Sequence, residues 1–244
     1  MAQQRAGRLR YWTLRIALVL LVIGTLWAAW EAWHWPDVSA LARRNPSSTA
    51  FIDRYRDQQR SAGKPMRVAW TWAGYGAIAA SLKRAVVVAE DIRFFSHRGF
   101  EPGEWRDAVE RAIERQEMPR GASTITQQLA KNLWLTPSRN PVRKMREAVL
   151  TWQLERNLSK RRILELYLNV AEFGPGIYGV EAASRHYFRK RASDLDEEEA
   201  AQLAASLPMP QSWHPGATGR GYRRYVETIR RRMEKAEFLT KLVQ

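Results

Sequence analysis

Residues 121–132 read Gly121-Ala-Ser-Thr-Ile-Thr-Gln-Gln-Leu-Ala-Lys-Asn132, and the rest of the chain is best interpreted around this stretch. The glycine relieves the backbone of a Cβ, and Thr124 followed three residues later by Gln127 fits the capping box of a helix start. Gln127 and Lys131 are four residues apart, so they share one helical face. Exposed amides, hydroxyls and a lysine at a helix start suit an anionic or sugar-bearing ligand. A polar surface helix with a good cap explains the same spacing.

Length and composition limit the class of protein. The chain has 244 residues, which suits one main domain with a small appendage and allows a substantial core. Apolar residues make up 45% of it and eleven are tryptophan, which argues against a disordered chain. It has no cysteine, so disulfides, thiolate metal sites and a cysteine nucleophile are excluded. The formal charge of +15 predicts an anionic partner: nucleic acid, acidic lipid headgroups or a phosphorylated substrate.

An uncharged run near the N-terminus predicts a membrane anchor. It covers residues 16–30, and counting back to Tyr11, with Arg15 snorkelling toward the interface, gives the roughly 20 residues that a spanning helix needs. Tryptophans cluster at its far end, as in an interfacial aromatic belt. A cleaved signal peptide is the alternative, but the alanines near the end lack the small residue two places earlier that cleavage requires. The arginines before the run predict a cytoplasmic N-terminus.

After the anchor, the chain is predicted to be mainly helical. A polar connection with proline and glycine follows, in which Phe51, Ile52 and Tyr55 are available to dock onto the main domain. Residues 67–71 alternate and form the best strand candidate. Apolar residues recur at helical spacing in segments 81–91, 104–116, 141–152, 162–173 and 219–244. The acidic run 194–199 reads as a helix start that Asp196 caps.

Two adjacent carboxylates stand at the end of the helix predicted from residue 81. With Ser81 as its N-cap, the helix delivers Glu90 and Asp91 to its C-terminal end. The helix dipole disfavours negative charge there. Two acids in that position are therefore candidates for function.

A basic and acidic triplet lies on the helix predicted after residue 141. Arg143 and Lys144 precede Glu147 by four and three residues, so all three side chains project from one face. An intrahelical salt bridge on a solvated surface is the alternative explanation.

Taken together, these motifs resemble those of the peptidoglycan glycosyltransferases, the lysozyme-like enzymes that polymerise lipid II, in their monofunctional, membrane-anchored form. The ordered motifs fall at residues 90–99, 121–132, 143–147, 163–179 and 199–210. The resemblance implies a mainly α, lysozyme-like domain of two lobes around a cleft, preceded by one transmembrane helix. We divide the chain accordingly into tail and anchor (1–35), connecting segment (36–66) and glycosyltransferase domain (67–244). Some bifunctional relatives carry a lysine near the position of Pro208, so another cation must serve here if that lysine binds phosphate.

The resemblance also implies the chemistry. The growing glycan moves from its undecaprenyl-pyrophosphate carrier to the 4-hydroxyl of lipid II, with inversion to a β-1,4 link. Glu90 is the implied general base, and Lys131, Arg143 and Lys144 are candidates to neutralise the leaving pyrophosphate. Glu147 is the second catalytic candidate: it orients those cations, holds a metal or assists at the donor's anomeric carbon. The other substrate-binding candidates are Asp91, Ser123, Thr124, Thr126, Gln127, Gln128 and Asn132. The residues expected to build the motifs are Phe94, His97, Gly99 and Gly121, and Asp91 is expected to help orient the first of these motifs.

The implied setting is the inner membrane, with the catalytic domain on the periplasmic side. No cofactor is obligatory and no metal ligand is assigned, although a divalent ion (Mg²⁺ or Mn²⁺) on the pyrophosphate is left open. The implied partners are lipid II, the undecaprenyl-pyrophosphate-linked glycan and membrane lipid, with cell-wall synthesis proteins as further candidates and no nucleic acid. A lysozyme-like hydrolase or lytic transglycosylase that cleaves the same polymer is the nearest alternative. A membrane-tethered nucleic-acid-binding protein explains the charge but not the paired carboxylates.

Overall fold

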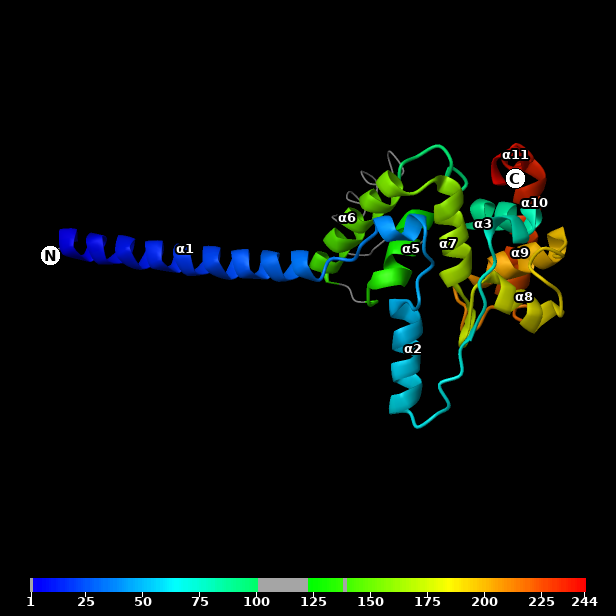
Figure 1. Cartoon of the computed structure of the whole chain (residues 1–244), viewed down its shortest axis with the longest axis horizontal. Helices are drawn as coiled ribbons and strands as arrows, with labels where there is room; N and C mark the ends of the chain where they lie inside the picture. The colour runs from blue at the N-terminus through cyan, green and yellow to red at the C-terminus, as the bar shows by residue number, and fades with distance from the viewer. Residues whose placement is uncertain (1, 101–122, 138–139) are drawn as a thin grey trace. The chain divides into compact units, whose positions relative to one another are not determined.

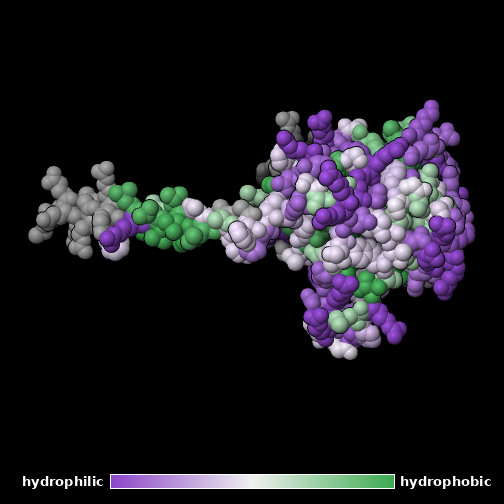
Figure 2. Space-filling view, viewed as in Figure 1, coloured by the Kyte–Doolittle hydropathy of each residue, from purple (hydrophilic) through white to green (hydrophobic). Residues whose placement is uncertain are grey.

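The computed structural model describes residues 2–100, 123–137 and 140–244, and it divides the chain into two compact units, Met1–Asp37 and Val38–Gln244. The first unit contains one helix, α1 (Ala2–Trp33). Its stretch Leu14–Glu31 is long and apolar enough to cross a membrane, as the sequence predicts. Figure 2 shows apolar residues covering the middle of this helix on the face in view.

The second unit consists mainly of helices in two groups (Figure 1). The first group packs around α5, and its members are η1 (Ser39–Ala42), α2 (Ala50–Ser61), α5 (Ile125–Trp134), α6 (Pro141–Asn157) and α7 (Lys160–Val170). The second group packs around α3, and its members are α3 (Ala80–Glu90), α9 (Glu197–Ser206), α10 (Arg220–Lys235) and α11 (Leu239–Val243). Two further elements are η2 (Tyr75–Ala77) and α8 (Val180–Phe188).

A small sheet consists of two strands that lie between α7 and α8 in the chain and one strand from far upstream. Its order is β1 (Ala69–Trp70), β3 (Ile177–Tyr178) and β2 (Glu172–Gly174), with β1 parallel and β2 antiparallel to β3. The strand predicted at residues 67–71 is thus confirmed. The segment predicted as helical ends at residue 173, and no strand was predicted for residues 174–179 that follow it. They form part of a hairpin whose strands are too short to show an alternating pattern.

Apolar side chains on facing helices form the core. Leu82 and Val86 of α3 and Ile125 and Leu129 of α5 are fully buried. On α10 the predicted apolar stripe is buried as expected, with Ile229 at its centre. The predicted C-terminal helix, however, ends at Lys235, and α11 follows as a separate helix.

Two predicted helix starts have different outcomes. Asp196 caps α9 in a full capping box with Glu199. The prediction of Ser81 as an N-cap is wrong, because α3 begins at Ala80 and Ala79, two residues before Ser81, occupies the cap position. The Ser81 hydroxyl instead donates to the carbonyl oxygen of Leu195, 2.9 Å away, and so ties α3 to the segment before α9. The helix predicted at 104–116 and the turn residue Gly121 lie outside the described residues.

Candidate functional site

Glu90 is the last residue of α3, where it faces the start of α5. Its Oε2 accepts a hydrogen bond from Nε2 of Gln128 at 2.6 Å. Burial raises the pKa of Glu90 above its ordinary value, while the Gln128 hydrogen bond and the charge of Lys131 act in the opposite direction. The result is a half-buried carboxylate that is more basic than a solvated one, with Gln128 as its hydrogen-bond donor and Lys131 as a nearby positive charge.

Lys131 connects Glu90 electrostatically to the triplet on α6. Burial lowers the pKa of Lys131, and the carboxylates of Glu147 and Glu90 oppose that effect, whereas Arg143 and Lys144 add to it. Lys131 therefore interacts with two carboxylates and two other cations, and it links them in one cluster.

Glu147 is the buried member of the cluster, with only 3% of its surface exposed. Its Oε2 accepts from Nη1 of Arg143 at 2.6 Å, and its Oε1 accepts from Nζ of Lys144. The predicted common face of these residues is confirmed, and the pairing is not on a solvated surface. A buried carboxylate between two cations fixes the position of both.

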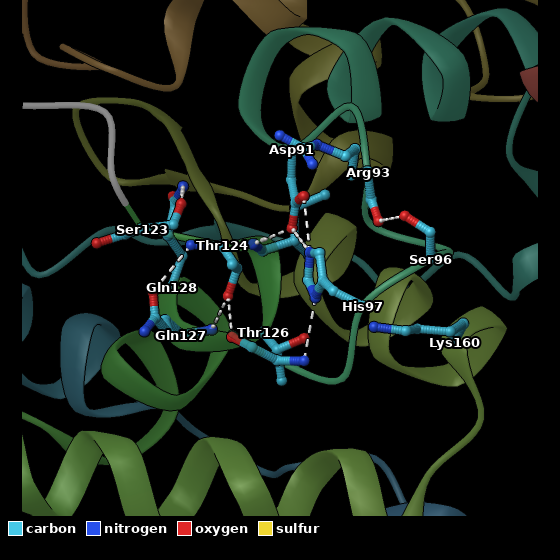
Figure 3. A network of polar contacts seen from close by, with 12 residues as sticks. Asp91, Arg93, Ser96, His97, Ser123, Thr124, Thr126, Gln127, Gln128 and Lys160 are labelled. Carbon is cyan, nitrogen blue, oxygen red and sulfur yellow. Dashed lines mark hydrogen bonds and ion pairs between the residues drawn. The ribbon is translucent and has the colours of Figure 1, made fainter. Parts of the chain in front are cut away.

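Asp91 and His97 join the end of α3 to the start of α5 (Figure 3). Both are buried, and Nε2 of His97 lies 2.9 Å and 3.0 Å from the two carboxylate oxygens of Asp91. The backbone N–H of Gly99 donates to Nδ1 of the same ring, so the Nε2 proton must face Asp91. Asp91 also accepts from the backbone N–H of Ile125, 3.0 Å away. This places Asp91 at the base of the site as a support for α5.

The capping box predicted for α5 is confirmed. The hydroxyl of Thr124 accepts from the backbone N–H of Gln127, and the Gln127 side chain accepts from the backbone N–H of Thr124. The same hydroxyl donates to the carbonyl oxygen of Gly99 at 2.7 Å. Gly99 has φ +83°, and a Cβ there would lie 2.7 Å from Cγ2 of Thr151. Glycine is therefore required at this junction.

The predicted substrate-binding residues of α5 separate into two sets. Gln128 and Lys131 are half-buried, and Ser123 just before the helix is too. Thr126 is fully buried and donates to Oε1 of Glu155 at 2.5 Å. Of the predicted binding residues at or on this helix, those that the fold buries are Thr124, Thr126, Gln127 and Asn132.

Two contributions to the site were not predicted from sequence. The Tyr167 hydroxyl of α7 donates to Oε1 of Gln128 at 2.9 Å. Lys160, also on α7, donates to Glu155 at 2.8 Å and lies 4.4 Å from the centre of the buried Phe94 ring. Tyr167 lies within the motif at residues 163–179 that supports the family resemblance. Its helical spacing, however, marked it only as a core residue.

Comparisons with known proteins agree with the geometry. A family model described as Transglycosylase matches residues 59–234. The biosynthetic peptidoglycan transglycosylase of Methylobacillus flagellatus is 42% identical over 224 residues, which are 92% of this chain and 95% of the relative. The protein of the same name from Azoarcus sp. is 44% identical over 222 residues, 89% of this chain and 94% of the relative. That from Alcanivorax borkumensis is 46% identical over 197 residues, 81% of this chain and 76% of the relative.

Proposed function

The chain belongs to the transglycosylase family, and on that premise we propose that it is a peptidoglycan glycosyltransferase that polymerises glycan chains for the cell wall. In the reaction we propose, the growing glycan is transferred from its undecaprenyl-pyrophosphate carrier to the 4-hydroxyl of lipid II, with inversion. The acceptor hydroxyl must lose a proton as it attacks. The leaving pyrophosphate must have its negative charge neutralised.

Glu90 is our candidate for the general base. A base acts best when its pKa lies near the working pH, and the raised pKa of Glu90 moves it in that direction. The Gln128 hydrogen bond orients the carboxylate and leaves its other oxygen for the acceptor hydroxyl. No proton donor is needed for the leaving group, because pyrophosphate leaves as a stable anion.

The observation that carries the proposal is the cation cluster beside Glu90. Lys131, Arg143 and Lys144 supply preorganised positive charge within reach of one another, which is what a departing pyrophosphate requires. The planar guanidinium of Arg143 presents parallel N–H donors that suit two oxygens of one phosphate. A hydrolase that cleaves the finished polymer releases no pyrophosphate and has no use for such a cluster.

We assign Glu147 the role of organising these cations. Both of its oxygens are already engaged by Arg143 and Lys144, so the residues present do not suit a resident metal ion on this carboxylate. We expect any Mg²⁺ or Mn²⁺ to arrive on the pyrophosphate of the substrate. Polymerisation with and without a chelator measures that requirement.

The test of the base is Glu90→Gln. We expect the variant to fold and to lose at least about 10²-fold in the rate of lipid II polymerisation, since it lacks a group to accept the proton. Glu227→Gln, an exposed carboxylate on α10, is the matched control and is expected to keep wild-type activity. A near wild-type rate in Glu90→Gln would show that the base is another group.

A second assay separates synthesis from cleavage. The wild-type protein is incubated in parallel with lipid II and with finished peptidoglycan. We expect glycan strands from lipid II and no soluble fragments from peptidoglycan. Release of fragments without polymer would support the hydrolase alternative.

For location, we propose that α1 anchors the chain in the inner membrane with its N-terminus in the cytoplasm and the enzyme domain outside. Helix α6 supports contact of the enzyme domain with lipid. Three apolar residues of the predicted helical segment 141–152, namely Met145, Val149 and Trp152, are 69%, 45% and 53% exposed. The Arg156 guanidinium lies 5.4 Å from the Trp152 ring centre. An exposed apolar stripe ending in a tryptophan and an arginine is suited to a membrane interface.

A further inference from the structure

A hollow of about 400 Å³ opens between α2 and the sheet. Its lining combines three aromatic side chains (Phe51, Tyr55 and Tyr178), glutamines that include Gln58 and Gln211, the carboxyl group of Glu172 and the guanidinium of Arg54. The α2 residues of this set precede residue 59, where the match to the family model begins. No role was assigned to the hollow by the motifs.

Glu172 is the polar centre of the hollow. Burial raises its pKa to about 7. Its Oε1 accepts from Nε2 of Gln211 at 2.6 Å, and the backbone N–H of Gly176 also donates to the carboxyl group. In the described part of the chain no lysine or arginine forms an ion pair with Glu172. A carboxylate offers about four acceptor positions, so this one has capacity for further hydroxyl or amide donors. A half-buried carboxyl that has no cation partner is costly unless donors satisfy it.

The aromatic walls are held in place by the backbone. Gly176 has φ +73°, and a Cβ there would lie 2.6 Å from the Tyr55 hydroxyl oxygen, so only glycine lets Tyr55 pack against the hairpin. The Tyr55 and Tyr178 rings meet edge to face, with centroids 6.2 Å apart. The Tyr178 hydroxyl donates to the carbonyl oxygen of Phe51 at 3.4 Å. The hollow is therefore preorganised.

Phe51 places the hollow next to the cation cluster. It lines the hollow, and its ring centre lies 5.9 Å from Nζ of Lys131. Phe51 therefore lies between the hollow and Lys131 of the cluster.

We infer that the hollow is a distal subsite that binds an N-acetylated sugar of the growing glycan strand, remote from the bond being formed. The inference rests on the proposed function. Aromatic rings pack against the apolar face of a sugar ring, the Glu172 carboxylate accepts hydrogen bonds from its hydroxyls, and the amides of Gln58 and Gln211 pair with the acetamido group. The subsite retains the strand between successive additions.

The dependence of activity on the length of the glycan strand distinguishes the role of this subsite from that of the reacting groups. The first coupling joins two lipid II molecules, and its donor is too short to reach a distal subsite. We therefore expect Tyr55→Ala and Glu172→Gln to leave the rate of the first coupling within twofold of wild type. The same variants should give markedly shorter glycan strands on a polyacrylamide gel, because the strand dissociates sooner.

Direct binding is measured with a soluble, uncrosslinked glycan octasaccharide by calorimetry, using the full chain in detergent. We expect about tenfold weaker binding in Glu172→Gln, equivalent to the loss of one hydrogen bond to a charged group. Tyr55→Phe keeps the ring and should retain wild-type strand lengths. Arg60→Ala, a change of an exposed side chain on the same helix, is the matched control.

Three results bear on the inference in different ways. Unchanged strand lengths and octasaccharide affinity in both variants overturn it, and so does an equal loss of first coupling and elongation. If the wild-type protein makes no polymer from lipid II, the proposed function fails, whereas the octasaccharide measurement still decides whether the hollow binds glycan.

Discussion

At the scale of single residues, Tyr167 controls which way Gln128 faces. A carboxylate only accepts hydrogen bonds, so the amide NH₂ of Gln128 must point to Glu90 and its oxygen is left for a donor. The Tyr167 hydroxyl is that donor. Tyr167 thus acts on Glu90, our candidate base, through another side chain, as a positioning residue.

We expect Tyr167→Phe to move the acidic limb of the pH–rate profile upward. Without the hydroxyl, the Gln128 amide is free to turn, and its hydrogen bond to Glu90 weakens. That bond lowers the pKa of Glu90, so its loss raises the pKa further, and activity falls at a higher pH than in wild type. Gln128→Ala should shift the limb in the same direction by more. A limb that stays in place in both variants would exclude this role.

Glu172 gives a second pH-dependent prediction, independent of any ligand. The pKa of this group is raised from 4.5 to about 7 on folding, so the stability associated with its proton is present below pH 4.5 and is lost as the pH rises through 7. Glu172→Gln does not titrate and keeps an acceptor for Gln211. We expect the variant to melt a few degrees higher than wild type at pH 8 and at the same temperature near pH 4.5, as measured by circular dichroism in detergent. Equal melting temperatures at pH 8 would contradict the burial argument.

Residue-scale prediction from sequence succeeded where the relevant partner lay within one helical turn. Arg143 and Lys144 meet Glu147 because residues three and four apart share a face. Prediction from sequence was incomplete for the side chains of α5, because tertiary packing decides which face of the helix is covered. Thr126 faces Glu155 of α6, twenty-nine residues away, and spacing within α5 carries no information about that contact.

At the scale of elements, the start of α5 is a joint between two motifs. The Thr124 hydroxyl caps the helix and also donates to the Gly99 carbonyl, so one side chain fixes α5 to the loop after α3. We expect Thr124→Ala to destabilise the protein by about 1–2 kcal/mol, as loss of a helix cap does, and to lower activity because Gln128 and Lys131 follow on the same helix. Denaturant unfolding of the full chain in detergent measures the change.

Thr124→Ser is the control for this joint. Serine keeps the hydroxyl and should restore most of the lost stability and activity. If Ser and Ala variants were equally destabilised, packing of the methyl group rather than the two hydrogen bonds would hold the joint.

Helices were predictable as elements, because apolar residues at helical spacing mark α3, α6, α7 and α10 directly. The hairpin β2–β3 was not, because its strands of three and two residues are too short for a periodic signal. Its parallel pairing with β1 joins residues about a hundred positions apart. That pairing also builds one wall of the hollow between α2 and the sheet. For this reason no pattern in the sequence indicated the hollow.

At the scale of the whole molecule, the exposed stripe on α6 has to be reconciled with the chain's positive charge. Met145 and Trp152 would be unfavourable in water, but the hollow beside Trp152, about 590 Å³, is lined by Arg98, Arg156 and Lys160. Apolar side chains next to cations match the boundary between acyl chains and anionic headgroups. On our proposal that α6 contacts lipid, the stripe brings the enzyme domain to the depth at which a lipid-linked pyrophosphate lies.

This argument predicts a difference between two ways of presenting lipid II. We expect the double variant Met145→Ser and Trp152→Ser to polymerise lipid II in detergent micelles at the wild-type rate, because micelles deliver the substrate without a bilayer. In vesicles that contain anionic phospholipid, the same full-length variant should be slowed several-fold, because α1 keeps it in the bilayer while the stripe no longer draws the enzyme domain to the surface. Leu242→Ser, which removes an exposed apolar side chain on α11, should be active in both. Equal rates of the double variant and wild type in vesicles would show that α6 does not contact lipid.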